Sequence, residues 1–252
     1  MSRHSPGAMA RIGLMLYSVR DECARDFEGV LRSVGAIGYE GVEIFDLHGH
    51  EAAVVRGWLD ELGLIAVSRH AGLDVIETRL PELAEESRVL GWRRLALSWL
   101  DPATLETPGL AAHIGDLAAA AREQGLELGF HNHDAELRPL SSGMTFFDEL
   151  PSELWIELDL GWAWYAGVDV PAFLIRVRDR CPIVHVKDIA SREGKEFRPV
   201  GDGAVGYDRL APAAVAAGVE WLLVEQDEAK GPTIDAAERS FAALTGMLEV
   251  TA

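Results

Sequence analysis

The chain has little cysteine, no CxxC pair and no long apolar segment. Its 252 residues include two cysteines, Cys23 and Cys181, which are far apart and fit ordinary thiols in a reducing compartment. No apolar run approaches the roughly 20 residues that cross a bilayer, and the first residues lack the apolar centre of a secretion signal. We therefore expect a cytoplasmic protein without a membrane partner.

Positive charge is also scarce. Lysine and arginine number 23 against 41 aspartates and glutamates, so the formal net charge is −18. Because nucleic-acid binding depends on cations that neutralise phosphates, this balance excludes a nucleic acid as the main partner. A small neutral sugar or polyol is compatible with it. Assembly into a homo-oligomer stays open.

Strand-like and helix-like segments alternate along the whole chain. The strand-like segments are residues 12–18, 42–45, 65–69, 94–98, 127–130, 155–158, 183–186 and 221–224. The helix-like segments are residues 26–37, 51–62, 82–90, 105–124, 144–149, 170–178, 207–217 and 234–248. Eight such pairs predict an α/β protein, a single (β/α)8 TIM barrel over residues 11–252 behind a flexible tail over 1–10. An open doubly wound sheet is the alternative.

Four of the later strands end on side chains that bind metals: His131, Asp159, His185 and Glu225. In a parallel barrel the carboxyl ends of the strands lie side by side, so these four side chains are expected to converge. Two imidazoles and two carboxylates suit a divalent cation such as Mn²⁺, Mg²⁺, Co²⁺ or Zn²⁺. The sequence therefore predicts a divalent-metal site.

His133 and Glu136 follow the same strand as His131. Strand alternation places His131 and His133 on one side, so both imidazoles can face the barrel mouth. We assign His131 as the metal ligand and His133 as a substrate contact or acid/base group, with the reverse still open. Glu136 is a third candidate for the metal, or a loop carboxylate that holds an imidazole N–H or contacts substrate.

Three more ionisable residues follow or close strands. Glu43 and His70 do so early in the chain, where we expect them to contact substrate. Lys187 lies on the same side of its strand as His185, where its ammonium can hold a substrate oxygen or offset the acidic cluster, and we count it with Glu225 and His133 as a candidate catalytic residue. The alternative for Lys187 is a surface ion pair with Asp188.

Aromatic residues also follow several strands, among them Tyr17, Trp99 and Trp162. Sugars present apolar C–H faces that pack on aromatic rings, so these three are candidate substrate contacts, with core packing as the alternative. The segment 201–206 lacks both a Walker lysine and the dinucleotide-binding glycine spacing, and we expect a flexible loop over the site.

The chain resembles the sugar phosphate isomerase/epimerase superfamily, the xylose isomerase-like TIM barrels, over about residues 12–248. The motifs that carry the resemblance lie at residues 16–20, 38–43, 69–73, 131–134, 158–159, 185–188, 200–203 and 224–228. The most distinctive are His131-Asn132-His133-Asp134 and Val224-Glu225-Gln226-Asp227-Glu228.

This resemblance implies one divalent ion held by Glu, Asp, His and Glu. Asp159, His185 and Glu225 match the last three positions, whereas His131 stands where those enzymes have glutamate. It also implies an isomerase or epimerase of a ketose or keto-sugar, in which the ion stabilises an enediolate, Glu225 takes the α-proton and His133 returns one. A lyase or dehydratase of a keto-sugar, inosose or 3-keto-glycoside could use the same enediolate. A non-catalytic sugar-binding barrel is the second alternative.

Overall fold

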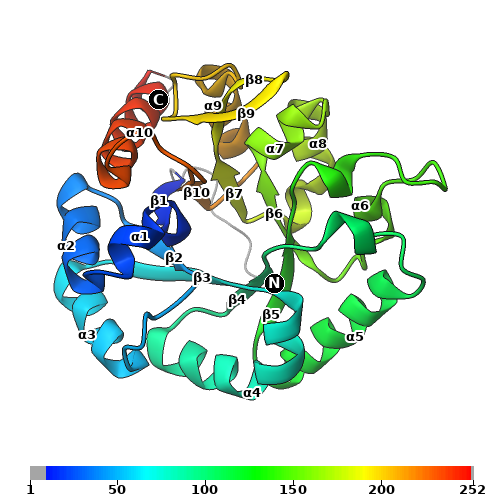
Figure 1. Ribbon diagram of the computed structural model, residues 1–252, viewed down its shortest axis with the longest axis horizontal. Coiled ribbons are helices and arrows are strands. Elements are labelled where there is room, and N and C mark those ends of the chain that lie inside the picture. Colours follow the sequence, from blue (N-terminus) through cyan, green and yellow to red (C-terminus); the bar gives the residue numbers. More distant parts are fainter. Residues whose placement is uncertain (1–9, 251–252) are drawn as a thin grey trace.

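A closed barrel of parallel strands forms the centre of the molecule, and helices surround it (Figure 1). The computed structural model describes residues 10–250, so the predicted tail over 1–10 lies, except for Ala10, outside the described residues. Within the described part, eight strands close the barrel in the order β1-β2-β3-β4-β5-β6-β7-β10. The predicted (β/α)8 TIM barrel is confirmed.

The barrel strands are β1 (Arg11–Met15), β2 (Gly41–Ile44), β3 (Ile65–Ala71), β4 (Arg94–Leu97), β5 (Glu127–His131), β6 (Trp155–Asp159), β7 (Ile183–Val186) and β10 (Trp221–Val224). The helices are α1 (Arg20–Cys23), α2 (Phe27–Ile37), α3 (Ala52–Leu62), α4 (Leu73–Leu90), α5 (Leu110–Glu123), α6 (Phe146–Glu149), α7 (Leu160–Tyr165), α8 (Val170–Val177), α9 (Tyr207–Ala216) and α10 (Thr233–Glu249). The last helix packs against both α9 and α2, which closes the outer ring.

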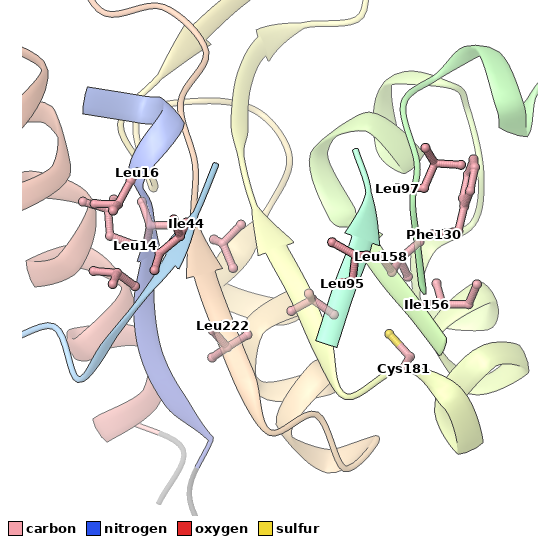
Figure 2. Packing of buried hydrophobic residues seen from close by; sticks show 14 of the residues in the cluster. Leu14, Leu16, Ile44, Leu95, Leu97, Phe130, Ile156, Leu158, Cys181 and Leu222 are labelled. Carbon is pink, nitrogen blue, oxygen red and sulfur yellow. The ribbon is translucent and has the colours of Figure 1, made fainter. Parts of the chain in front are cut away.

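The strands are buried on both faces, which explains their nearly continuous apolar sequences. Outward side chains such as Leu14, Ile44 and Leu158 belong to the large core between barrel and helices (Figure 2). The inward side chains of the lower barrel form a separate apolar plug: Val67, Ala96, Trp155, Ile183, Trp221 and Leu223. The buried histidines and carboxylates inside the barrel lie above this plug, toward the carboxyl ends of the strands.

Local signals set most helix ends. Asp26 caps α2 by accepting the backbone N–H of Gly29, and Gly38 ends that helix with a φ of 114°, in the left-handed region. Gly63 ends α3 in the same way with a φ of 67°. These boundaries agree with the predicted ranges to within one residue.

Several features differ from the predicted segments. The predicted strand 12–18 ends at Met15, where a 3-10 turn over Leu16–Val19 follows, and the predicted helix 105–124 begins at Leu110. The predicted helix 82–90 begins nine residues earlier, at Leu73, because α4 runs through Pro81 with a kink at Arg79, whose φ and ψ are −131° and 23°. The short helices α1 and α7 and a small antiparallel hairpin, β8 (Asp188–Ser191) and β9 (Gly194–Arg198), were not predicted. Among the described residues, no helix has the length and apolar character that a membrane crossing requires.

Candidate metal and substrate site

The register of the late strands brings their polar ends together. His131 of β5 pairs with Glu157 of β6, and Asp159 of β6 pairs with His185 of β7. Glu225 directly follows β10, whose Leu223 pairs with His185. Because side chains alternate along each strand, all these residues project into the barrel above the apolar plug.

Four residues, here called the mouth set, each place one ligand atom within 4.8 Å of the others. They are His131, Asp159, His185 and Glu225. All four side chains are buried. Within residues 10–250, Asp159 Oδ2 and His131 Nδ1 are buried without a hydrogen-bond partner. Buried polar atoms usually have hydrogen-bond partners, so these two atoms and the mixed N/O donors fit a divalent cation.

His185 is held at both ring nitrogens. Its Nδ1 lies 2.8 Å from Glu225 Oε2, and its Nε2 lies 2.7 Å from Glu43 Oε2. Burial acts to lower the pKa of His185, but the carboxylates of Glu157, Glu225 and Glu43 outweigh it and raise that pKa well above the usual value. A cation that binds the mouth set would therefore displace a proton from this imidazole.

Lys187 lies inside the barrel and neutralises carboxylates there. Its ammonium is 2.8 Å from Glu225 Oε2, 2.9 Å from Asp227 Oδ1 and 3.4 Å from Asp159 Oδ2. The alternative of a surface pair with Asp188 is wrong, since Lys187 is buried and Asp188 binds backbone N–H groups. Lys187 is not among the residues that line the cavity described below.

Charge and burial give the ionisable side chains at the barrel mouth different protonation states. Burial acts to raise the pKa of Glu225, but Lys187 and His185 pull it well below its usual value. Burial raises the pKa of Asp159 to about 6, in spite of Lys187. Burial, followed by the charge of Lys187, lowers the pKa of His133 to about 3. At neutral pH the site thus holds an ionised Glu225 beside a neutral His133.

A cavity of about 540 Å³ opens above the mouth set. Six of the predicted site residues line it: Tyr17, Trp99, His70, His131, His133 and Glu225. Tyr17 and Trp99 are exposed by 39% and 54%, so their rings are available to a ligand at the rim. Phe45, Asp227 and Glu228 also line the cavity.

Three predicted substrate contacts lie behind the cavity wall instead. Glu43 is fully buried, where its Oε1 accepts a hydrogen bond from Ser68. Glu136 is 1% exposed and accepts the backbone N–H of His133. Trp162 is also buried, with its ring 5.6 Å from that of His133. The position of a residue at the end of a strand did not show that its side chain would be buried. These three residues contact the residues that line the cavity and not the cavity itself.

Sequence reasoning missed Glu157, which is fully buried below the mouth and bonds to His70 Nε2. Burial, followed by the nearby Glu43, raises the pKa of Glu157 to about 7. The signal was present in the strand, because Trp155, Glu157 and Asp159 alternate and must share one side. It was overlooked because Glu157 does not end its strand.

Imidazoles and carboxylates gather at the carboxyl ends of the barrel strands. The protein therefore belongs to the class of parallel (β/α)8 barrels, whose sites are built at the carboxyl ends of the strands. More particularly, the chain belongs to the xylose isomerase-like TIM barrel family, whose pattern its residues 100–246 match. No curated protein matches the chain.

Several solved structures share the fold. A sugar phosphate isomerase/epimerase from Parabacteroides distasonis superposes with a TM-score of 0.77 at 16% identity, covering 94% of this chain and 98% of its own. The probable 3-DHS dehydratase AsbF from Bacillus anthracis gives 0.75 at 15%, covering 93% and 98%. The IOLI protein, described with a bound zinc atom, gives 0.73 at 12%, covering 95% and 98%. At these identities the likeness establishes the fold.

Proposed function

We propose that this protein is a divalent-metal-dependent isomerase or epimerase of a ketose or keto-sugar. The observation that carries the proposal is the convergence of the mouth set beside a cavity with exposed aromatic rings at its rim. His131, Asp159, His185 and Glu225 would hold the ion, and Mn²⁺, Mg²⁺, Co²⁺ or Zn²⁺ suits these donors. Once bound, the ion would polarise the substrate carbonyl and adjacent hydroxyl and stabilise an enediolate.

Glu225 is the residue we assign to remove the α-proton. It lines the cavity and is held ionised, so it can accept a proton at neutral pH. The ammonium of Lys187, 2.8 Å from its Oε2, fixes the orientation of the carboxylate. Lys187 is therefore a positioning residue for Glu225.

His133 is the residue we assign to the second proton transfer. It lines the cavity as a neutral imidazole, and its Nδ1 has no hydrogen-bond partner among the described residues. Glu136 holds its backbone N–H, and the Trp162 ring lies beside it. A neutral imidazole placed in this way can hold a substrate hydroxyl, and it can return a proton to carbon once its free nitrogen has taken a proton from the substrate or from water.

A lyase or dehydratase that acts on a keto-sugar, inosose or 3-keto-glycoside is the second candidate. It is favoured by the structural likeness to a probable dehydratase and by the histidine at position 131, which leaves the mouth set without a second glutamate. In that reaction His133 would protonate a leaving oxygen on the β-carbon. A binding barrel without chemistry remains a third candidate.

Incubation in deuterated water separates the first two candidates. With a panel of ketoses, the isomerase or epimerase should place solvent deuterium at the α-carbon of an intact sugar, detected by mass spectrometry. With 3-keto-glycosides or inososes, a lyase should release an aglycone or a dehydrated product instead. Neither product from either panel would contradict both catalytic proposals.

Elemental analysis of the bound metal distinguishes a metal-dependent enzyme from a binding barrel without chemistry. We expect the purified protein to carry, or to take up, a stoichiometric divalent ion, and Asp159→Asn to lower that content. Glu123→Gln, an exposed change on α5, serves as the matched control. A wild-type protein that takes up no ion would support the binding barrel.

We also propose a cytoplasmic location. Both cysteines are free and buried, which fits a compartment that keeps thiols reduced. Detection of the tagged protein in the periplasmic or secreted fraction of its source cells would contradict this placement.

A further inference from the structure

A second group of potential ligands lies below the mouth set. His70 of β3, His131 of β5, Glu157 of β6 and His185 of β7 also place one ligand atom each within 4.8 Å of one another. All four are buried. Glu157 belongs to this group alone, and it lies one inward position below Asp159 on the same strand, so this group is deeper in the barrel.

One carboxylate oxygen faces three imidazoles in this deeper group. Glu157 Oε2 bonds to His70 Nε2 and lies 3.3 Å from His131 Nδ1 and 3.4 Å from His185 Nε2. The two longer distances are typical of ligands that surround one cation, whereas the contact between His70 and Glu157 is a hydrogen bond that an ion would replace. The group therefore has the donors and the spacing for an ion.

Two atoms in this group lack hydrogen bonds. Among residues 10–250, Glu157 Oε1 and His131 Nδ1 are buried without a partner, although both side chains are at most 2% exposed. A buried imidazole nitrogen and a buried carboxylate oxygen that both lack hydrogen-bond partners are unusual in a folded interior and point to a missing ligand.

The charge around the group favours a cation as that ligand. Glu43 Oε2 lies 3.3 Å from His70 Nε2 and 2.7 Å from His185 Nε2, so two buried carboxylates, Glu43 and Glu157, meet here. Burying two carboxylates is costly unless positive charge offsets them. A divalent ion supplies that charge without protonated imidazoles.

An ion can reach this position from the cavity. His70 and His131 both line the cavity, whereas Glu157 lies fully buried next to them. An ion that enters beside the mouth set would thus meet two imidazoles before it meets the carboxylate.

We propose that His70, His131 and Glu157 form a second divalent-cation site, the deep site, which takes a borderline cation such as Zn²⁺ alongside the ion of the mouth set. His131 then binds the deep ion through Nδ1. Asp159, His185 and Glu225 remain as the three protein ligands of the mouth ion, a number that leaves positions open for substrate. Glu43 accepts the Nε2–H of His185 and so keeps Nδ1 directed at the mouth.

Zinc stoichiometry tests the deep site. The full-length protein is stripped with a chelator, loaded with excess Zn²⁺, passed through gel filtration and measured by elemental analysis. We expect two zinc ions per chain in the wild type and in Glu123→Gln, one in Glu157→Gln, one in Asp159→Asn and none in the double variant. A wild type that binds one ion, which Glu157→Gln keeps, would overturn the deep site.

The same series separates this inference from the proposed function. If Asp159→Asn loses an ion and Glu157→Gln loses none, the deep site is wrong and the mouth site stands. If Glu157→Gln loses an ion and Asp159→Asn loses none, the deep site stands and the mouth site is wrong.

Two measurements guard against a variant that does not fold. His70→Asn changes a different ligand and should also leave one zinc ion per chain. Titration of the wild-type protein with Co²⁺, followed by visible absorption, should show two successive phases. A single phase that saturates at one equivalent would overturn the deep site without any variant.

Discussion

Individual side chains in this barrel take their protonation states from burial and from a few charged neighbours. Glu225 and Asp159 are both buried carboxylates of the mouth set, yet the pKa of the first is lowered and that of the second is raised to about 6. The difference arises because Glu225 lies 2.8 Å from both the Lys187 ammonium and His185, whereas Asp159 Oδ2 is 3.4 Å from Lys187. The carboxylate nearest the cations is therefore the one held most firmly in its ionised form.

The first residue-scale prediction concerns Glu225→Gln. An amide cannot take the α-proton, so turnover or deuterium exchange should fall by at least about 100-fold. The amide oxygen can still bind an ion, so elemental analysis should find part of the metal retained. Glu123→Gln should match the wild type in both measurements. Exchange at the wild-type rate in Glu225→Gln would remove this residue from the mechanism.

The second residue-scale prediction concerns Glu136. Burial raises the pKa of its carboxyl group to about 7 from a usual value of 4.5. The folded protein holds this proton more tightly than the unfolded chain, so protonation stabilises the fold. That contribution is present below pH 4.5 and is lost as the pH rises to about 7. By linkage the loss is about 3 kcal/mol.

Glu136→Gln stays neutral at every pH and should avoid this loss. Urea unfolding should show variant and wild type close to equal near pH 4.5, with the variant more stable by about 2–3 kcal/mol at pH 8. A difference that does not change between these two pH values would contradict the raised pKa.

At the scale of elements, the hairpin β8–β9 and the loop that follows it are tied to the barrel by one side chain. Asp188 accepts the backbone N–H groups of Gly201, Gly203 and Val205, at 2.8, 3.1 and 3.2 Å. The expectation of a flexible loop over the site is therefore wrong for its backbone at these three points. Gly203 is required there, because a Cβ would lie 2.1 Å from Asp188 Oδ1.

The prediction for this element is that Asp188→Ala is strongly destabilising. Three buried or half-buried N–H groups would lose a charged acceptor, at a cost on the order of 3 kcal/mol in the free energy of unfolding. Hydrogen exchange at Gly203 and Val205 should also accelerate.

Asp202→Ala provides a control within the same loop. Asp202 pairs with Arg239 at the surface, where both side chains are about half exposed. Its loss should cost less than about 1 kcal/mol. Equal effects of the two variants would refute the anchoring role of Asp188.

At the scale of the whole molecule, burial makes the two thiols unreactive. Cys23 and Cys181 are each 1% exposed, and burial raises the pKa of each thiol to about 12. Since the thiolate is the reactive form, neither cysteine should react with a thiol reagent while the barrel is folded.

Thiol labelling therefore reports on unfolding of the barrel. At neutral pH an aromatic disulfide reagent should label no thiol in the native protein and two thiols in denaturing urea. The labelling transition should coincide with loss of the circular dichroism signal. Rapid labelling of one thiol in the native state would show that its helix or strand opens locally.

The sequence by itself determined the barrel and the convergence of the mouth set. Alternating apolar strands and glycine-ended helices are local patterns, and eight of them in succession leave few other folds. Parallel strands place their carboxyl ends together, so His131, Asp159, His185 and Glu225 had to meet. These conclusions need only the period of a strand and the direction of the chain.

Only the tertiary structure decided the depth and the partners of the polar residues. Whether a side chain faces the cavity, as Glu225 does, or lies behind it, as Glu43 does, depends on the register between neighbouring strands. The same register pairs Lys187 with Asp227 across 40 residues and places Glu157 beneath the mouth. Strand stagger in a closed barrel arises from packing between strands distant in sequence, and no local pattern contains it.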